Sequence, residues 1–371
     1  MGHDTVSLLW REPALTARFQ TAVCLHGHTW HSEECLSFLP THLRHIPGIS
    51  HLIRQSQCRP VDAVDYARAF WTPPLAPACA LALEKKQIQE RGLAPIVSLT
   101  DHDSIEACLS LQQQEDNGQT PISVEWTTPY EQSIFHFGVH NLPPCLAREW
   151  MSVMASYTTA PDENLLPAIL QDLGRIPEVL IVLNHPYWLE EGVTESAHRL
   201  ALARILRECP DGFHAFELNG TRAWKENAAV IQLAGECGRP VISGGDRHAC
   251  EPAACLNLTN ASTFGEFAAE VRSSYSQVLF MPHYREPMSL RILETAWDIL
   301  RPYPEYPGRE RWIQRIFYRG EDGVARPLSV VWRNGVPWFL NAATGLLQFI
   351  AMRGVRLTLR RLMPLEAEAL P

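Results

Sequence analysis

Asp246 and His248 lie two residues apart in the stretch 241–249, which reads Val-Ile-Ser-Gly-Gly-Asp-Arg-His-Ala. The stretch starts as an apolar strand and then meets two glycines. Residues two apart in an extended segment project to the same side, so a carboxylate and an imidazole are predicted to share one space. Both groups are metal ligands. A single pair of this kind is typical of a surface turn, so its interpretation depends on whether the pattern recurs.

The pattern recurs, because several other apolar runs of the chain end in or contain His and acidic residues. Residues 21–25 lead into a His-Gly-His sequence, and 178–183 lead into Asn-His-Pro. A random scatter of His and Asp would not fall at one end of so many strands. The candidate metal ligands are His26, His28, Glu33 (or its neighbour Glu34), His102, Glu125, His136, His185, Asp246 and His248.

The elements that must position these residues alternate along the chain. Seven apolar strand-like runs begin at Thr21, Pro95, Pro121, Ser133, Glu178, Phe213 and Pro240. Helical segments are predicted at about 78–92, 105–114, 142–174, 195–208 and 222–237. Strands that alternate with helices indicate an α/β fold with a mostly parallel sheet. In a closed α/β barrel the carboxyl ends of the strands converge on one mouth, where chemistry is carried out.

The number of candidate ligands exceeds what one metal ion takes in a site of nitrogen and oxygen donors, about four to six. Two or three ions that share a bridging carboxylate would use the whole set. Glu125 and Asp246 are the carboxylates best placed to bridge. Mixed imidazole and carboxylate ligands suit Zn, Mn or Fe, and the sequence does not choose between them.

The ordered set of motifs resembles the PHP (polymerase and histidinol phosphatase) domain family over about residues 21–280. It consists of HGHTWHSE (26–33), TDHD (100–103), Glu125 before Trp-Thr-Thr, the strand with His136, NHP (184–186), ELN (217–219) and GGDRH (244–248). The resemblance implies a distorted (β/α)7 barrel that carries two or three divalent metal ions and hydrolyses phosphoesters.

The resemblance also implies how the ligands divide. One ion would take His26, His28, Glu125 and Asp246, and a second would take Glu125, His136 and His185. A third would use the residue near Glu33 with His102 and His248. Two features depart from the family pattern: Glu33 and Glu34 stand where members often have Asp-Gly, and a long excursion at 36–77 replaces a short link.

The predicted function is hydrolysis of a phosphoester, most simply a small phosphomonoester or a nucleotide, by a metal-bridging hydroxide formed near neutral pH. Asp246 and His102 are the predicted catalytic residues, and Asp246 would accept the proton of the water. Arg247 is either a phosphate contact or an exposed turn residue, and Glu217 and Asn219 are interpreted as supporting groups. The alternatives are a 5′ exonuclease on short oligonucleotides and a catalytically silent binding module. An amidohydrolase-like enzyme is disfavoured, because no lysine stands at a strand end.

Composition limits the class of protein. The chain has 371 residues, 46% of them hydrophobic and 20% charged, which is typical of a globular protein. Its net charge of −9 argues against a protein that attracts nucleic acid over its whole surface. Arg44, Arg54, Arg59 and Trp71 are the candidates for a local nucleic-acid surface, but their spacing shows no regular stripe, so a solvated loop is the favoured interpretation. Ten cysteines without CxxC pairs, no secretory signal and no apolar run of membrane-spanning length predict a cytoplasmic protein that binds no membrane.

The predicted domain division has three parts: a lead-in with one short helix at 1–20, the catalytic barrel at 21–280 with the insertion at 36–77, and an extension at 281–371. The insertion is expected to hold a helix near 61–70 and to roof the mouth. The extension is expected to hold a helix at 287–300, a proline-rich joint at 301–308 and a hairpin at 329–340 that turns at Asn334-Gly335. Its arginines (Arg353, Arg356, Arg360 and Arg361) are read as a solvated helix face or a partner contact. We expect the part after Tyr303 to be an appendage, and the oligomeric state stays open.

Overall fold

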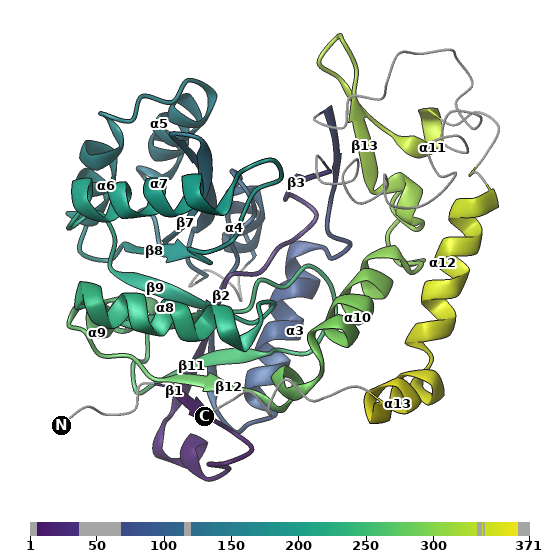
Figure 1. The fold of residues 1–371 in the computed structure, drawn as a ribbon, viewed down its shortest axis with the longest axis horizontal. Coiled ribbons are helices and arrows are strands. Elements are labelled where there is room, and N and C mark those ends of the chain that lie inside the picture. The colour runs from purple at the N-terminus through teal and green to yellow at the C-terminus, as the bar shows by residue number, and fades with distance from the viewer. Residues whose placement is uncertain (1–5, 37–67, 115–119, 332–335, 337, 363–371) are drawn as a thin grey trace.

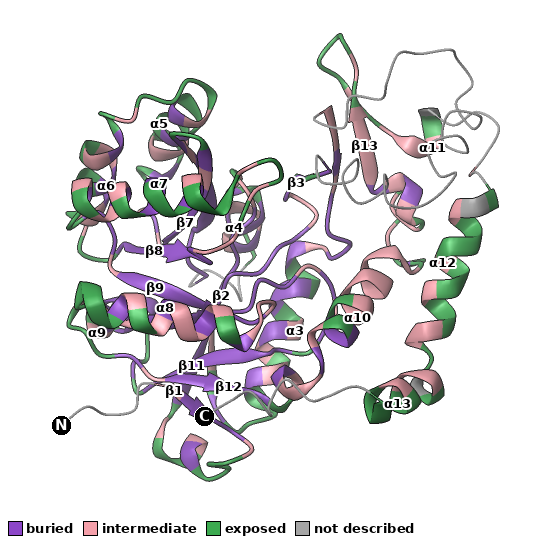
Figure 2. Ribbon diagram, in the orientation of Figure 1, coloured by how far each residue is buried: buried purple, intermediate pink, exposed green. Residues whose placement is uncertain are grey.

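The computed structural model describes residues 6–36, 68–114, 120–331, 336 and 338–362. It is a mixed α/β structure with two five-stranded sheets, helices around them and a smaller four-stranded sheet at one end (Figure 1). Figure 2 shows that the strands of the two large sheets are buried, whereas the helices around them expose one face. The core therefore lies on and between these two sheets.

The first large sheet contains both termini of the predicted barrel region. Its strands, in spatial order, are β1 (Val6–Leu8), β12 (Val278–Phe280), β11 (Cys255–Thr259), β2 (Thr21–Leu25) and β5 (Ala94–Ser98). β1 pairs with β12 and β2 with β5 in parallel, whereas β11 is antiparallel to both of its neighbours. The segment before β2, predicted to be a lead-in, thus supplies a sheet strand as well as the short helix η1 (Leu15–Arg18).

The second large sheet carries the other predicted strands. In spatial order they are β10 (Val241–Gly244), β9 (Ala215–Asn219), β8 (Leu180–Asn184), β7 (Ser133–His140) and β6 (Val124–Tyr130). β8, β9 and β10 are parallel, but β7 is antiparallel to both β6 and β8. Only two residues connect β6 and β7, and such a short turn permits only an antiparallel pair. The prediction of a mostly parallel sheet is therefore wrong, because half of the ladders in the two large sheets are antiparallel.

Six of the seven predicted strand runs lie mostly within strands, whereas the run that begins at Pro121 reaches only Val124, the first residue of β6. In space the strands follow one another as β2, β5, β6, β7, β8, β9 and β10. Isolated bridges join the two large sheets, one between Gly27 and Arg247 and one between His102 and Glu125. Within the described residues no continuous ladder closes these strands into a barrel. The (β/α)7 barrel remains a prediction, and a mixed α/β fold is what the structure shows.

Helices cover the outer faces of the large sheets close to their predicted positions. They are α3 (Pro77–Gln89), α4 (Glu106–Gln112), α5 (Ala147–Thr159), α6 (Leu166–Gly174), α7 (Glu195–Glu208), α8 (Trp224–Cys237) and α9 (Phe264–Arg272). The single helical region predicted at 142–174 is two helices. α8 ends at Gly238, whose φ of +64° is the left-handed conformation that glycine adopts without strain.

The small sheet combines residues from the insertion and from the extension. Its order is β14 (Ala325–Pro327), β13 (Ile316–Arg319), β4 (Ala69–Trp71) and β3 (Glu34–Cys35). The helix predicted near 61–70 is wrong at its end, because residues 69–71 form β4; residues 61–67 and the arginines Arg44, Arg54 and Arg59 lie outside the described residues. The insertion is thus tied to the C-terminal part of the chain.

The C-terminal part begins with α10 (Met288–Leu300), as predicted, and continues through η5 (Trp312–Gln314), α11 (Leu328–Val331), α12 (Trp338–Ala351) and α13 (Arg353–Leu362). The hairpin predicted at 329–340 is wrong, because helices occupy both of its arms; Asn334 and Gly335 lie outside the described residues. The observed hairpin is β13–β14. Tyr303 is fully buried, so the predicted appendage does not begin there.

The described helices include none that is long and apolar enough to cross a membrane.

Candidate metal centre

Glu125 is the carboxylate at the middle of the cluster. Its Oε2 lies 2.9 Å from Nε2 of His26, 3.4 Å from Nε2 of His28 and 3.3 Å from Nε2 of His102. Its Oε1 lies 3.1 Å from Nε2 of His185 and 3.6 Å from Nδ1 of His136. One carboxylate therefore presents each of its oxygens to a different group of imidazoles, which is the arrangement of a bridging ligand.

The position of Glu125 differs from the sequence prediction. It is the second residue of β6 and not the residue after a strand, and the bridge to His102 joins β6 to the segment that follows β5. Burial alone would raise the pKa of Glu125, but His26, His102 and His136 outweigh that effect and hold the pKa well below its usual range. The side chain is ionised and ready to hold cations.

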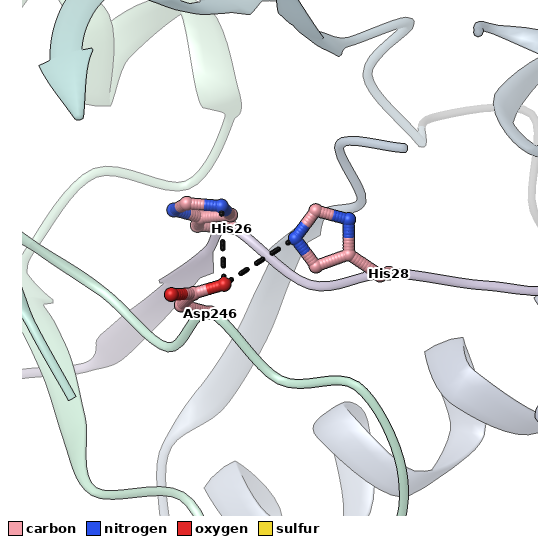
Figure 3. A group of neighbouring side chains, drawn as sticks. All are labelled: His26, His28 and Asp246. Atoms are coloured by element: carbon pink, nitrogen blue, oxygen red, sulfur yellow. Dashed lines mark ion pairs between the residues drawn. The ribbon is translucent and has the colours of Figure 1, made fainter. Parts of the chain in front are cut away.

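His26, His28 and Asp246 form the first group of candidate ligands. Figure 3 shows both imidazoles directed at one oxygen of Asp246, Oδ1, at 3.5 Å for His26 and 3.4 Å for His28. Burial lowers the pKa of His28 to about 4, so its imidazole is neutral at pH 7 and offers a lone pair. These three residues can therefore hold one ion together with Glu125.

The backbone that places this group is not the extended one predicted from the two-residue spacing. His26 has a φ of +62° and Asp246 a φ of +48°, so both lie just past the ends of β2 and β10 in left-handed conformations. His185, after β8, also has a positive φ, of +26°. Non-glycine residues in this region are strained, and such residues gather at functional sites.

His136 and His185 form the second group, on the other side of Glu125. Their rings are 5.2 Å apart and nearly perpendicular, and Trp188 stacks on His136 at 5.3 Å. His136 lies within β7, opposite Asn184 of β8, so the antiparallel pairing brings it beside His185. The structure thus brings together Glu125, His136 and His185, the three residues that the resemblance assigns to the second ion.

The third group contains Glu34 and not Glu33. Oε2 of Glu34 lies 3.5 Å from Nε2 of His102 and 3.4 Å from Nε2 of His248, and Oε1 lies 3.6 Å from Nδ1 of His28. Glu33 points outward and pairs with Arg319 at 2.8 Å. Of the two neighbouring glutamates, the structure therefore places Glu34, and not Glu33, beside the histidines of this group.

Arg247 has neither of its two predicted roles. It is 4% exposed and pairs with the buried Glu84 at 3.0 Å. Its backbone carbonyl accepts a hydrogen bond from the backbone N–H of His28 at 2.8 Å. Arg247 therefore fixes the loop that carries Asp246 and His248 to the loop that carries His28, and its guanidinium is not available to a substrate.

A layer of polar groups orients the candidate ligands. Oε1 of Glu217 lies 2.5 Å from Nδ1 of His26, and Oε2 accepts the backbone N–H of His185 at 2.9 Å. Such contacts fix the tautomer and the ring plane of a ligating imidazole. A side chain at Gly244 would overlap the Glu217 carboxylate, so the first glycine of the motif makes room for this support.

Two further supporting residues were missed by the sequence reasoning. Asn184 donates to Oε1 of Glu125 at 3.0 Å, and Thr221 donates through its hydroxyl to Oδ2 of Asp246 at 3.0 Å. Asn219 also donates to Oδ2 of Asp246, at 3.1 Å. Asn184 directly precedes His185, which is the one sequence signal that pointed to it; Thr221 has none.

The donor set fits divalent metal ions. Within the described residues, Nε2 of His28 and Nδ1 of His136 are buried without a hydrogen-bond partner, although a buried polar atom is costly to leave unpaired. Both atoms face the cluster, and a metal ion would satisfy them. Groups of ligand atoms close enough to share an ion include His26–His28–Asp246, His28–Glu34–His102 and His102–Glu125–His136.

The cluster opens to solvent on one side. The side chains of His102 and His248 are 17% and 18% exposed, whereas those of Glu125, Asp246 and the other histidines of the cluster expose 9% or less. The indole of Trp71, on β4, lies 5.6 Å from the ring of His248. A substrate would therefore enter past His102, His248 and Trp71.

Comparison with known proteins gives weak similarities. No family model and no curated protein matches this chain. Among solved structures, PsfC from Pseudomonas syringae PB-5123 is similar over 71% of this chain and 93% of its own, at 12% identity and a TM-score of 0.41.

Two further solved structures cover less of this chain. An amidohydrolase from Chromobacterium violaceum with bound sulfate and no metal is similar over 48% of this chain and 84% of its own, at 14% identity and a TM-score of 0.33. A proposed metal-dependent phosphoesterase from Bifidobacterium adolescentis is similar over 54% and 92%, at 12% identity and a TM-score of 0.34. All three TM-scores lie below 0.5, so these similarities establish neither a family nor an activity, and the proposal below depends on the geometry.

Proposed function

We propose that this protein is a metal-dependent phosphoesterase of the PHP type. The observation that carries the proposal is Glu125, a buried and ionised carboxylate with imidazoles on both of its oxygens. Two ions fit this arrangement, and a third fits Glu34, His102 and His248. Zn, Mn and Fe all suit the mixed nitrogen and oxygen donors.

Bound ions would supply an activated water near neutral pH and would neutralise charge on the phosphoryl oxygens. Asp246 is the general base of the proposal. Asn219 and Thr221 hold its Oδ2, which leaves Oδ1 toward the histidines. Burial alone would raise the pKa of Asp246, but His26, His28 and His248 outweigh that effect and keep it well below its usual range, so the carboxylate is ionised.

His102 is the second catalytic residue of the proposal. It lies at the solvent side of the cluster, 3.3 Å from Glu125 and 3.5 Å from Glu34, so a substrate at the mouth reaches it before the deeper ligands. The low exposure of the cluster, in which even His102 and His248 are only 17% and 18% exposed, supports a small phosphomonoester or a nucleotide as the substrate. A short oligonucleotide with a 5′ phosphate is the alternative, because Trp71 beside His248 offers a surface on which a base stacks.

The test of the proposed function begins with protein freed of metal by chelation and reloaded separately with Zn, Mn or Fe. Each form is assayed against a panel of phosphomonoesters, nucleotides and a matched panel of amides. We expect phosphoester hydrolysis that depends on metal and no hydrolysis of amides. Preferential cleavage of amides, or equal activity in metal-free protein, would overturn the proposal.

Substrate class is decided by competition at matched concentrations between nucleoside monophosphates, histidinol phosphate and a 5′-phosphorylated oligonucleotide, at low and high salt. We expect the small substrates to be preferred with little effect of salt. Preferential degradation of the oligonucleotide that weakens steeply with salt would favour the exonuclease alternative. Stoichiometric metal without any hydrolysis would favour a catalytically silent module.

A further inference from the structure

Glu34 is carried by a different sheet from the other candidate ligands. It lies on β3, a strand of two residues that belongs to the small sheet and not to either large sheet. Among the described strands β3 pairs with β4 alone, in the register Glu34 with Trp71 and Cys35 with Phe70, and the Leu36 N–H donates to the Ala69 carbonyl at 3.2 Å. The Ser32 hydroxyl also donates to Oε1 of Glu34 at 2.7 Å. The backbone of so short a strand is fixed by its pairing only if the partner strand is itself held.

β4 is held by β13, which comes from the C-terminal part of the chain. The register pairs Ile316 with Trp71 and Phe317 with Phe70. The rings of Phe70 and Phe317 stack at 5.3 Å with an interplanar angle of 12°, and the Thr72 N–H donates to the Arg315 carbonyl at 2.8 Å. Within the described residues, β13 is therefore the strand that pairs with β4 on the side away from β3.

β13 is anchored in turn to the main body. Arg315, at the start of β13, is 2% exposed and donates to the carbonyls of Ile299 at 2.7 Å and Arg301 at 2.9 Å. These carbonyls lie at the end of α10. On the other side of the sheet, Arg319 pairs with Glu33, a residue 286 positions away in the chain. A continuous set of contacts thus runs from α10 through β13 and β4 to Glu34.

We propose that β13 holds Glu34 in the third metal position, so that a divalent cation bound by Glu34, His102 and His248 depends on the C-terminal part of the chain. The inference rests on the proposed function, because it requires the centre to bind metal. It reverses the expectation that the chain after Tyr303 is an appendage. Phe317 is a positioning residue in this account, since it touches neither metal nor substrate.

The experiment measures metal binding rather than activity. Chelated protein is titrated with Mn or Zn by calorimetry, and the ratio of metal to protein is determined by mass spectrometry after dialysis. Phe317→Ala removes the ring that supports Phe70. We expect the most weakly bound ion to be lost or weakened at least ~10-fold, the lower end for losing support of a ligand, while the other ions bind as before.

Three further proteins make the result specific. Glu34→Gln should lose the same ion, and the double variant Phe317→Ala with Glu34→Gln should lose no more than Glu34→Gln alone, because both changes act on one site. Phe349→Ala is the matched control: it removes a phenyl ring from α12 that is 56% exposed, and metal binding should not change.

Folding is checked by circular dichroism and thermal melting. If Phe317→Ala does not fold, Phe317→Val decides the question, because valine retains strand propensity without the ring and should weaken the same ion. Wild-type metal binding in a folded Phe317 variant would overturn the inference, as would wild-type binding in Glu34→Gln. Wild-type protein that binds no metal would instead overturn the proposed function.

Discussion

Two parts of the candidate centre are built on different structural foundations. The ligands around Glu125 come from strands of the two large sheets or from the loops that follow them, and β2, β8, β9 and β10 are buried along their whole length. Glu34 comes from the small sheet, where β13 is half-buried and ends in an exposed residue. The deep ligands are thus positioned by the hydrophobic core, whereas Glu34 is positioned by pairing between segments far apart in the chain.

The comparison implies that replacing a ligand in one part should change metal binding differently from replacing a ligand in the other. Loss of a deep ligand should affect the ions on both sides of Glu125, because that carboxylate faces five histidines. Loss of Glu34 should affect one ion and leave the others in place. The following predictions test this difference, from the largest expected effect to the smallest.

Glu125→Gln should have the largest effect, because glutamine keeps the shape of the side chain but removes the bridging charge. We expect metal content to fall on both sides of the residue and phosphoester turnover to fall more than ~1,000-fold, beyond the usual cost of losing one charge-stabilising group. Glu149→Gln on the exposed side of α5 is the control and should change neither quantity. Retained metal and turnover in Glu125→Gln would show that the carboxylate does not bridge.

Asp246→Asn removes the proposed base and one ligand charge while leaving the fold intact. We expect turnover to fall at least ~100-fold, the low end for losing a general base, with an unchanged circular dichroism spectrum. Steady-state kinetics on the best small phosphoester measures the effect. Near-normal turnover would mean that Asp246 has been assigned the wrong role.

Glu34→Gln and Glu33→Gln form a matched pair of neighbours. We expect Glu34→Gln to remove one ion and Glu33→Gln to remove none, because Glu33 only pairs with Arg319 at the surface. Metal stoichiometry separates the two variants directly. An equal loss in both, or a loss only in Glu33→Gln, would contradict the placement of β3.

His140 is a buried histidine of β7 that is not among the candidate ligands, and its contribution to stability should depend on pH. Its Nδ1 is 2.8 Å from the hydroxyl of Ser98, and burial lowers its pKa to about 3, with His26 adding to the effect. The unfolded chain protonates this residue near pH 6.5, so its contribution to stability is present above that pH and is lost as the pH falls toward 3.

We therefore expect His140→Gln to reduce the free energy of unfolding by about 1–2 kcal/mol at pH 7, the scale of a buried hydrogen bond. The difference from wild type should shrink between pH 6.5 and pH 4. Urea denaturation of metal-free protein at several pH values measures both. A difference that stays constant with pH would contradict the buried neutral state of His140.

Local sequence patterns were enough to predict much of the fold and most residues of the candidate centre. Apolar runs marked six of the seven strands, and the polar residues at His26, His185 and Asp246 marked the turns that follow β2, β8 and β10. The antiparallel pairing of β7 with β8 could not be predicted, because an apolar run has the same pattern whether it pairs in parallel or antiparallel. The left-handed turns at His26 and Asp246 were also not predictable, because the two-residue spacing suggested an extended backbone.

Long-range contacts account for the remaining differences. Glu33 and Glu34 are identical in chemistry, and only the pairing of β3 with β4 decides which of them faces His102 and His248. Arg247 has the sequence context of a turn residue, and only its contact with Glu84 of α3, far away in the chain, shows that its side chain is buried. The C-terminal hairpin was assigned to the Asn-Gly signal at 334–335, whereas the strands that pair are β13 and β14, joined by a turn that includes Gly320 and Gly323.

The central claim is that Glu125 bridges metal ions, and anomalous X-ray diffraction from crystals of the metal-loaded protein tests it most directly. Data collected on both sides of the absorption edge of the loaded metal locate each ion. We predict one ion between Oε2 of Glu125 and the His26–His28–Asp246 group, and a second between Oε1 and His136 with His185. A folded protein whose crystals hold no ion within bonding distance of either Glu125 oxygen would contradict the account.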